Sequence, residues 1–202
     1  MRKTAVFILL LALASVGAFA QTSDPLWADL LDGNGRFVEG RLDYCALTHL
    51  RAATAGGQSP PTSILSCADS RVPAELIFDR SVGELFTVRV AGNVEDTFGV
   101  ASLEYAVANG WTKLIVVMGH SDCGAVKAAY KPPRPEDLTP SLRLLIARIQ
   151  KSFTKPPRDL RDATIMNVHY TAEQLRLNPT LKGVQIVEAY YDVASGKVER
   201  LP

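Results

Sequence analysis

Three side chains of this sequence have the types and the spacing to hold a metal ion. His120 and Cys123 lie three positions apart, and a second thiol, Cys67, stands much earlier in the chain. Imidazole nitrogen and thiolate sulfur are preferred protein ligands of Zn²⁺. A His-x-x-Cys pair alone is weak evidence of a metal site, and a second Cys in the same local setting strengthens it. Three protein ligands leave the fourth tetrahedral position open, which is the pattern of catalytic rather than structural zinc.

The elements around the first pair predict where these ligands lie. Leu114–Met118 is a short apolar run that predicts a strand buried on both faces. Gly119 is expected to end that strand, and Ser121 or Asp122 to cap a helix that begins near Cys123. The ligands would then lie at the carboxyl edge of a strand, where open α/β sheets bind their ligands.

Cys67 has a matching position at the end of the short run Thr62–Ser66. Two adjacent parallel strands would bring the three ligands to one point. Asp69 and Arg71 follow in a turn, where such a pair is usually a surface ion pair of little worth. Beside a metal, however, the arginine would orient the carboxylate and keep it ionised. A disulfide between Cys67 and Cys123 is the rival interpretation, and it would abolish the metal site.

The chain has three cysteines, an odd number that does not favour a disulfide scaffold. Two thiols bound to zinc and one spare fit this number better. The spare residue, Cys45, lies in a run that is typical of a helix, and it is interpreted as a small buried apolar side chain.

Two motifs closely resemble the paired zinc motifs of the β-class carbonic anhydrases, and the chain is identified as a member of that family. They are Cys67-Ala-Asp-Ser-Arg-Val72 and Gly119-His-Ser-Asp-Cys-Gly124. The likeness runs from about Leu30 to Leu201. It also includes Leu31–Phe37, Gly57-Gln-Ser-Pro60, Gly83–Arg89, Ala91-Gly-Asn-Val94, Asn167-Val168 and Tyr191–Val198.

The resemblance implies the reversible hydration of CO2 to bicarbonate and a proton, with one Zn²⁺ per chain bound by Cys67, His120 and Cys123. Such a metal lowers the pKa of a bound water, and the hydroxide that forms would attack CO2. Asp69, held by Arg71, would accept a hydrogen bond from that hydroxide and orient it.

The resemblance also implies partners. Gln58, otherwise a solvated loop residue, would donate a hydrogen bond to bicarbonate. The chain would form an obligate homodimer with zinc clefts at the subunit interface, or two such dimers in a tetramer. Some relatives bind a regulatory bicarbonate through an arginine and a tryptophan. This chain has the arginine, Arg89, but Ile64 in the tryptophan position, so an open, unregulated site is expected.

Two other functions remain open at this point. Some relatives on the same fold hydrolyse carbon disulfide or carbonyl sulfide with an equivalent zinc triad. A non-catalytic periplasmic zinc-binding or thiol-redox module is the alternative from a different class. The Asp69–Arg71 pair argues against that module, because neither metal storage nor redox exchange needs an oriented carboxylate.

The first 20 residues have the pattern of a secretory signal peptide. Arg2 and Lys3 precede an apolar stretch, Ala5–Val16, and Ala18-Phe-Ala20 is a small-x-small cleavage site. A membrane anchor is less favoured, because the apolar stretch is short for a span. We therefore expect a mature carbonic anhydrase domain over residues 21–202, located in the periplasm or secreted.

Charge limits the kinds of partner. The chain has 22 basic and 21 acidic side chains, and loss of Arg2 and Lys3 gives the mature part a net charge of −1. It has no basic run with interleaved aromatic residues, so nucleic acid is not an expected partner. After signal cleavage no membrane association is expected either.

The alternation of strands and helices predicts an α/β fold with a mostly parallel central sheet flanked by helices and an antiparallel C-terminal edge strand. The expected helices are 24–31, 42–53, 73–78, 98–109, 141–153 and 159–177. The expected strands are 62–67, 84–91, 114–118, 184–192 and 197–201.

Overall fold

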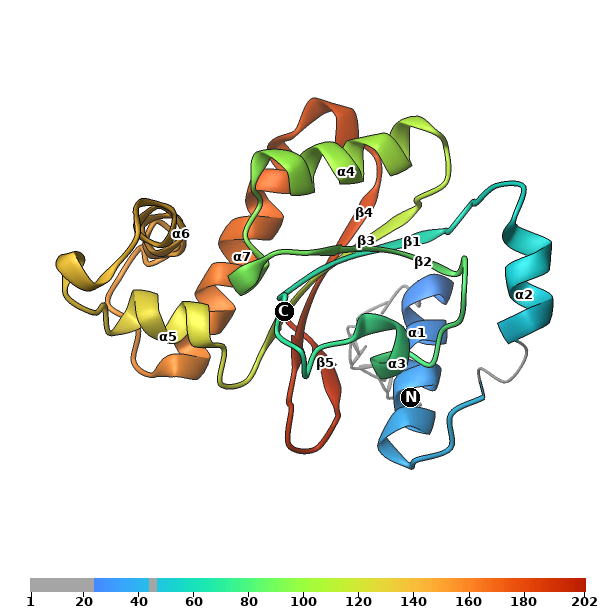
Figure 1. The fold of residues 1–202 in the computed structure, drawn as a ribbon, viewed down its shortest axis with the longest axis horizontal. Coiled ribbons are helices and arrows are strands. Elements are labelled where there is room, and N and C mark those ends of the chain that lie inside the picture. Colours follow the sequence, from blue (N-terminus) through green and yellow to red (C-terminus); the bar gives the residue numbers. More distant parts are fainter. Residues whose placement is uncertain (1–23, 44–46) are drawn as a thin grey trace, which may run out of the picture.

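The computed structural model describes residues 24–43 and 47–202, and in this part of the chain five strands form one sheet in the order β2-β1-β3-β4-β5 (Figure 1). The first four are parallel, and β5 runs antiparallel to β4. The predicted fold class is therefore confirmed. The strands are β1 (Thr62–Ser66), β2 (Leu85–Arg89), β3 (Leu114–His120), β4 (Gln185–Tyr191) and β5 (Val198–Arg200).

Helices cover both faces of the sheet, as Figure 1 shows. One face carries α1 (Pro25–Val38) and α3 (Ala74–Ile77), and the other carries α4 (Thr97–Ala108) and α7 (Leu160–Leu177). At one end lie α5 (Gly124–Tyr130) and α6 (Pro140–Gln150), whereas α2 (Leu47–Thr54) lies at the opposite margin. Short 3-10 turns are η1 (Ala91–Asn93), η2 (Pro135–Asp137) and η3 (Pro179–Leu181).

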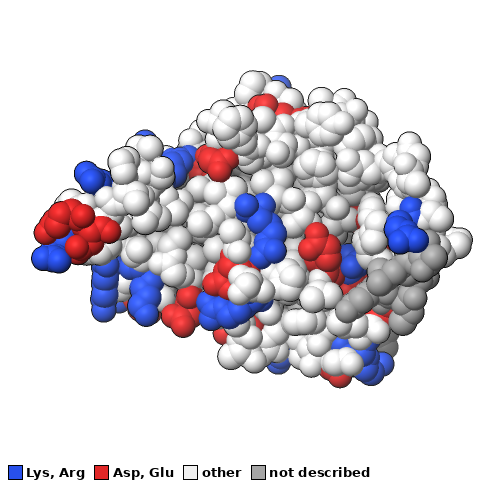
Figure 2. Space-filling model, viewed as in Figure 1, with Lys and Arg blue, Asp and Glu red and all other residues white. Residues whose placement is uncertain are grey.

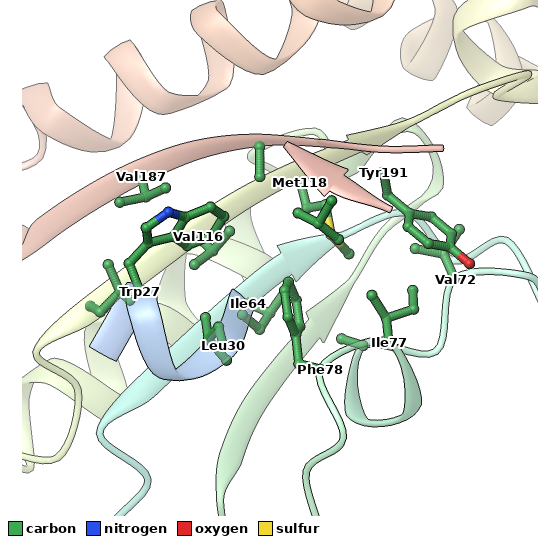
Figure 3. Packing of buried hydrophobic residues seen from close by; sticks show 14 residues of the cluster. Trp27, Leu30, Ile64, Val72, Ile77, Phe78, Val116, Met118, Val187 and Tyr191 are labelled. Atoms are coloured by element: carbon green, nitrogen blue, oxygen red, sulfur yellow. The ribbon is translucent and has the colours of Figure 1, made fainter. Parts of the chain in front are cut away.

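The central strand β3 is buried along its whole length and divides the core in two. Its side chains alternate between the faces, as the pleat requires. Val116 and Met118 pack with Trp27 and Leu30 of α1 (Figure 3), whereas Val117 packs toward α4 and α7. The uninterrupted apolar run in the sequence is thus explained by burial on both faces.

Helix α1 is longer than predicted, because it continues through Gly33 to Val38. Glycine is a poor helix former, but here tertiary packing requires it. A Cβ at Gly33 would lie 1.9 Å from the Phe78 carbonyl oxygen. The next residue, Asn34, donates hydrogen bonds to the carbonyls of Ile77 and Gly196, so contacts distant in sequence hold the second half of α1.

The predicted end of β3 at Gly119 is wrong, because the strand continues to His120. Gly119 pairs with Tyr190 in β4, and a Cβ there would lie 2.6 Å from Val168 and 2.8 Å from Thr164 of α7. The glycine therefore permits a close approach of helix and strand rather than a break.

The predicted cap of the following helix is also wrong. Cys123 itself occupies the N-cap position of α5, without a side-chain cap hydrogen bond. Ser121 Oγ instead accepts a hydrogen bond from the Val193 amide, and Asp122 adopts a positive φ of 57°. These residues form the turn that carries the chain from His120 to Cys123.

The remaining predicted elements lie within a few residues of their observed bounds. Of the expected helix 42–53, only the part from residue 47 onward lies among the described residues, as α2. Cys45 and the predicted signal peptide lie outside them.

In the described ranges, no helix combines the length and the apolar character that a membrane span needs. Basic and acidic side chains are interspersed on the face that Figure 2 shows, without a continuous basic stripe.

Candidate metal centre

Parallel pairing of β1 and β3 brings the three predicted ligands together. Ser66, the last residue of β1, pairs with Met118, so both strands end at the same edge of the sheet. Cys67 follows directly, His120 ends β3, and Cys123 precedes the first turn of α5. The ligand atoms of these three residues all lie within 4.8 Å of one another, and all three side chains are buried.

The spacing of the sulfurs fits a tetrahedral metal. The Sγ atoms of Cys67 and Cys123 are 3.9 Å apart. A tetrahedral Zn²⁺ with Zn–S bonds of about 2.3 Å would place its two sulfurs about 3.8 Å apart. The two sulfurs are far beyond bonding distance, and both thiols are free, so the rival disulfide is not formed.

His120 presents one nitrogen to the thiols. Its Nδ1 lies 2.9 Å from the Ser121 carbonyl oxygen, a partner that assigns the proton to Nδ1. Nε2 then carries the lone pair. This buried atom has no hydrogen-bond partner among the described residues, although burial of such a group is costly unless something binds it. A metal ion between Nε2 and the two sulfurs would satisfy it.

The two thiols influence one another strongly. The Cys123 thiol hydrogen-bonds to Cys67, which lowers the pKa of Cys67, and the Gly92 amide adds to this effect. The hydrogen bond to Cys67 in turn raises the pKa of Cys123, and burial adds to this effect. A divalent cation is what would permit both sulfurs to be thiolates at once.

Asp69 and Arg71 form the predicted pair beside the ligands. The guanidinium donates from Nε to Oδ1 across 2.9 Å and from Nη2 to Oδ2 across 2.8 Å. This bidentate bond holds the pKa of Asp69 well below its usual range. Oδ2 lies 3.9 Å from His120 Nε2, so the carboxylate borders the cluster while it stays paired with arginine.

Arg89 has a role that the sequence did not indicate. It is the last residue of β2, an outer strand of the sheet. Its Nε and Nη2 donate to the carbonyls of Cys67 and Asp69, across 3.2 and 2.6 Å. Arg89 therefore fixes the backbone of the ligand turn. Ile64 is fully buried in the core, as an apolar side chain in β1 requires.

Gln58 is not brought to these residues within one chain. It is exposed and precedes β1, whereas Cys67 follows that strand. The strand alone separates the two edges of the sheet by about 13 Å, at about 3.3 Å per residue.

Sequence reasoning missed one contact with a ligand sulfur. The Gly92 amide donates a hydrogen bond to Cys67 Sγ across 3.2 Å. The only signal was the motif Ala91-Gly-Asn-Val94, which showed the likeness but assigned no role.

Comparisons with known proteins agree with this geometry. The family model described as carbonic anhydrase matches residues 62–198. Carbonic anhydrase 2 of Mycobacterium tuberculosis (strain CDC 1551 / Oshkosh) is 50% identical over 105 residues, which cover 51% of this chain and 50% of that protein. The carbonic anhydrase of Mycolicibacterium smegmatis is 36% identical over 187 residues, 86% of this chain and 90% of that protein. The match thus spans about half the length of the first relative and most of the second.

Solved structures share the fold. A tetrameric β-carbonic anhydrase of Sordaria macrospora has a TM-score of 0.69 at 24% identity, covering 88% of this chain and 98% of that chain. The Coccomyxa β-carbonic anhydrase in complex with acetazolamide has a TM-score of 0.68 at 25% identity, covering 90% and 86%. From the family model and the near full-length relative, we conclude that this chain belongs to the β-carbonic anhydrase family.

Proposed function

We propose that this protein catalyses CO2 + H2O ⇌ HCO3⁻ + H⁺ at a zinc ion bound by Cys67, His120 and Cys123. The observation that carries the proposal is the convergence of two sulfurs and an otherwise unpartnered Nε2 beside an ionised carboxylate. The relatives named above as carbonic anhydrases support the same reaction.

Zinc at this position would supply a Lewis acid that makes water nucleophilic near neutral pH. Two thiolates and one neutral imidazole would balance the charge of the cation and leave its fourth position open. His120 can serve as a neutral ligand because its Nδ1 proton is donated to the Ser121 carbonyl.

The proposed role of Asp69 is to orient the attacking water. Because Arg71 keeps its pKa low, the carboxylate is a hydrogen-bond acceptor and not a donor across the neutral range. It can accept a hydrogen bond from the attacking water and direct a lone pair toward CO2. Arg71 in turn holds the carboxylate through two parallel bonds and restrains it from moving toward the metal.

We further propose that the active form is a homodimer in which Gln58 serves the metal centre of the other subunit. Gln58 lies at the wrong edge of the sheet to reach Cys67 of its own chain. In addition, β2 is an outer strand with half-exposed side chains, and the described side chains of α2, residues 49–54, are exposed or half-buried. A second chain could bury these surfaces in a dimer interface.

The location is a separate proposal, since residues 1–20 lie outside the described part. We propose export and cleavage after Ala20, from the charged start, the apolar stretch and the Ala18-Phe-Ala20 site. Mass analysis of the N-terminus of the native protein tests it. An intact Met1 on cytoplasmic protein would contradict both cleavage and export.

Stopped-flow CO2 hydration with metal-replete protein tests the reaction, together with elemental analysis of the bound metal. We expect about one zinc per chain and its loss in Cys123→Ala. Cys45→Ala is the matched control and should keep its zinc. Full zinc without hydration above the buffer rate would reject the reaction, and full zinc in Cys123→Ala would reject the ligand set.

A further inference from the structure

The sulfur of Cys67 is held by a backbone amide that lies 25 positions away in the sequence. Gly92, in the turn η1 after β2, donates its N–H to Cys67 Sγ across 3.2 Å. Such a bond stabilises a thiolate and restricts the direction in which its remaining lone pairs point. Groups that orient a ligand in this way contribute to metal affinity even though they do not touch the metal.

The conformation that aims this amide is one that glycine adopts without the steric cost that a Cβ brings. Gly92 has a φ of +69°, in the left-handed region. A Cβ at this position would lie 2.8 Å from Cδ1 of Ile149 and 3.3 Å from Cβ of Ala125. The turn is therefore packed against α5 and α6. Because glycine has access to many backbone conformations, a hydrogen-bond partner that selects this one would fix the direction of the amide.

That partner is Asn167 of helix α7. Its Nδ2 donates a hydrogen bond to the Gly92 carbonyl across 2.7 Å, and the side chain is 1% exposed. Its helix neighbours Thr164 and Val168 pack on Gly119, next to the ligand His120. Helix α7 thus contacts two glycines of the backbone near the ligands: Gly92, which hydrogen-bonds to Cys67, and Gly119, which precedes His120.

We propose that Asn167 is a positioning residue of the metal centre, because through the Gly92 carbonyl it holds the amide that hydrogen-bonds to Cys67 Sγ. The chain of contacts runs from the Asn167 amide to the Gly92 carbonyl, and from the Gly92 N–H to the sulfur. Both bonds belong to one residue, so together they fix its backbone angles. The inference rests on the metal centre proposed above, but it does not depend on the reaction.

Two variants remove the amide donor. Asn167→Leu has a side chain of similar shape and leaves no large cavity, whereas Asn167→Ala removes the side chain. We expect either change to raise the zinc dissociation constant about 10-fold in a chelator competition. In the Co²⁺-substituted protein, we expect the sulfur-to-cobalt charge-transfer band to shift, which a loss of stability alone would not cause.

Asn178→Ala is the matched control. Asn178 follows the last residue of the same helix and donates its Nδ2 to Glu104 Oε1 across 2.8 Å. This variant loses a hydrogen bond from the side-chain amide and the one that its Oδ1 accepts from the Thr180 amide, but neither bond involves η1. It should therefore keep the zinc affinity and the cobalt spectrum of the unchanged protein.

A measurement on the unchanged protein tests the proposal even if the variants do not fold. In the ¹¹³Cd-substituted protein, a hydrogen bond to a metal-bound sulfur transmits a scalar coupling between the metal and the amide proton. We expect that coupling at Gly92 and its loss or reduction in Asn167→Leu.

The outcomes separate the two proposals. If the unchanged protein binds no metal through Cys67, the proposed centre itself fails. If it binds metal but Gly92 shows no coupling, or a folded Asn167 variant keeps both affinity and spectrum, only the positioning role is overturned. An equal loss of affinity in Asn178→Ala would also overturn it, since the effect would then come from the helix as a whole.

Discussion

Three groups at the metal centre are each held by another group of the chain. The Ser121 carbonyl sets the tautomer of His120, the Gly92 amide contacts the sulfur of Cys67, and Arg71 holds Asp69. Because these hydrogen bonds are already formed, the side chains need little rearrangement when a metal or a substrate binds. The chemistry at this scale therefore depends on hydrogen bonds as much as on the ligands.

Arg71→Gln tests whether the hydrogen bonds that hold Asp69 matter for the reaction. Glutamine can donate one hydrogen bond but carries no charge, so the two parallel bonds to Asp69 are lost. We expect kcat/KM for CO2 hydration to fall about 10- to 100-fold while the zinc content stays near one per chain.

The matched control for Arg71→Gln is Arg134→Gln, which removes an exposed arginine that pairs with Asp137 away from the metal centre. It should leave hydration unchanged. Normal hydration in Arg71→Gln would contradict the proposed role of the pair.

The elements are joined by close backbone approaches and by a few buried polar contacts. Gly119 lets α7 approach β3, and Gly33 lets α1 approach Phe78. Asp79 joins α1 to the segment after α3, because it accepts hydrogen bonds from Arg36 and from the Asp43 amide. Burial acts to raise the pKa of Asp79, but these hydrogen bonds outweigh it and lower the pKa.

Gly119→Ala should reduce the free energy of unfolding by about 1–3 kcal/mol, because the new methyl group must displace α7 from the sheet. Gly35→Ala is the control, since a Cβ there would meet no atom of the described residues within 4 Å. At this exposed position in the last turn of α1 it should stabilise by at most about 0.5–1 kcal/mol. Urea unfolding measures both, and equal effects of the two changes would contradict the packing argument.

Asp79→Asn should lower the free energy of unfolding by about 1–3 kcal/mol at pH 7. A lowered pKa in the folded state stabilises the fold above the ordinary carboxyl pKa of about 3.9, and this contribution is lost as the pH falls through the folded-state value. The difference between variant and unchanged protein should therefore shrink below about pH 4.

Asp29→Asn is the control for the pH series. Asp29 also pairs with an arginine between α1 and the segment after α3, but its side chain is 62% exposed. Its effect should stay within about 0.5 kcal/mol at either pH. A difference for Asp79→Asn that does not change with pH would show that the carboxylate charge is not the cause.

At the scale of the whole molecule, one chain does not contain a complete substrate site under the proposed function. The metal centre lies at the carboxyl edge of the sheet, and Gln58 precedes β1 at the opposite edge. A two-fold dimer could supply Gln58 to each centre from the other subunit, since a two-fold interface places the same surface on both subunits.

Mixing two inactive variants tests this arrangement. Gln58→Ala should lose hydration activity but keep its zinc, and Cys123→Ala should lose its zinc. If Gln58 acts on the other subunit, hybrids unfolded and refolded together should regain activity well above either parent. No recovery in hybrids that sedimentation shows to be dimers would contradict the action of Gln58 on the other subunit.

The candidate metal ligands and the fold class were predictable from local patterns in the sequence. His120, Cys123 and Cys67 were predictable because each follows a short apolar run, and parallel strands place their carboxyl ends at one edge. The Asp69–Arg71 pair was predictable because it is local, with its partners two positions apart. Periodicity and turn residues located most elements for the same reason, since local propensity and burial pattern act over a few residues.

Contacts between groups that are distant in the sequence were not predictable, because they depend on how the chain folds. The amide of Gly92 reaches Cys67 across 25 positions, and Asn167 reaches Gly92 across 75. Likewise, Gly119 was expected to end a strand, and the expected helix 24–31 stopped before Gly33. Both glycines lie within regular structure instead, because the atoms packed against them leave no room for a Cβ. The physical reason is that close packing and buried hydrogen bonds depend on which segments lie side by side in space. Sequence patterns over a few residues do not show which segments these are.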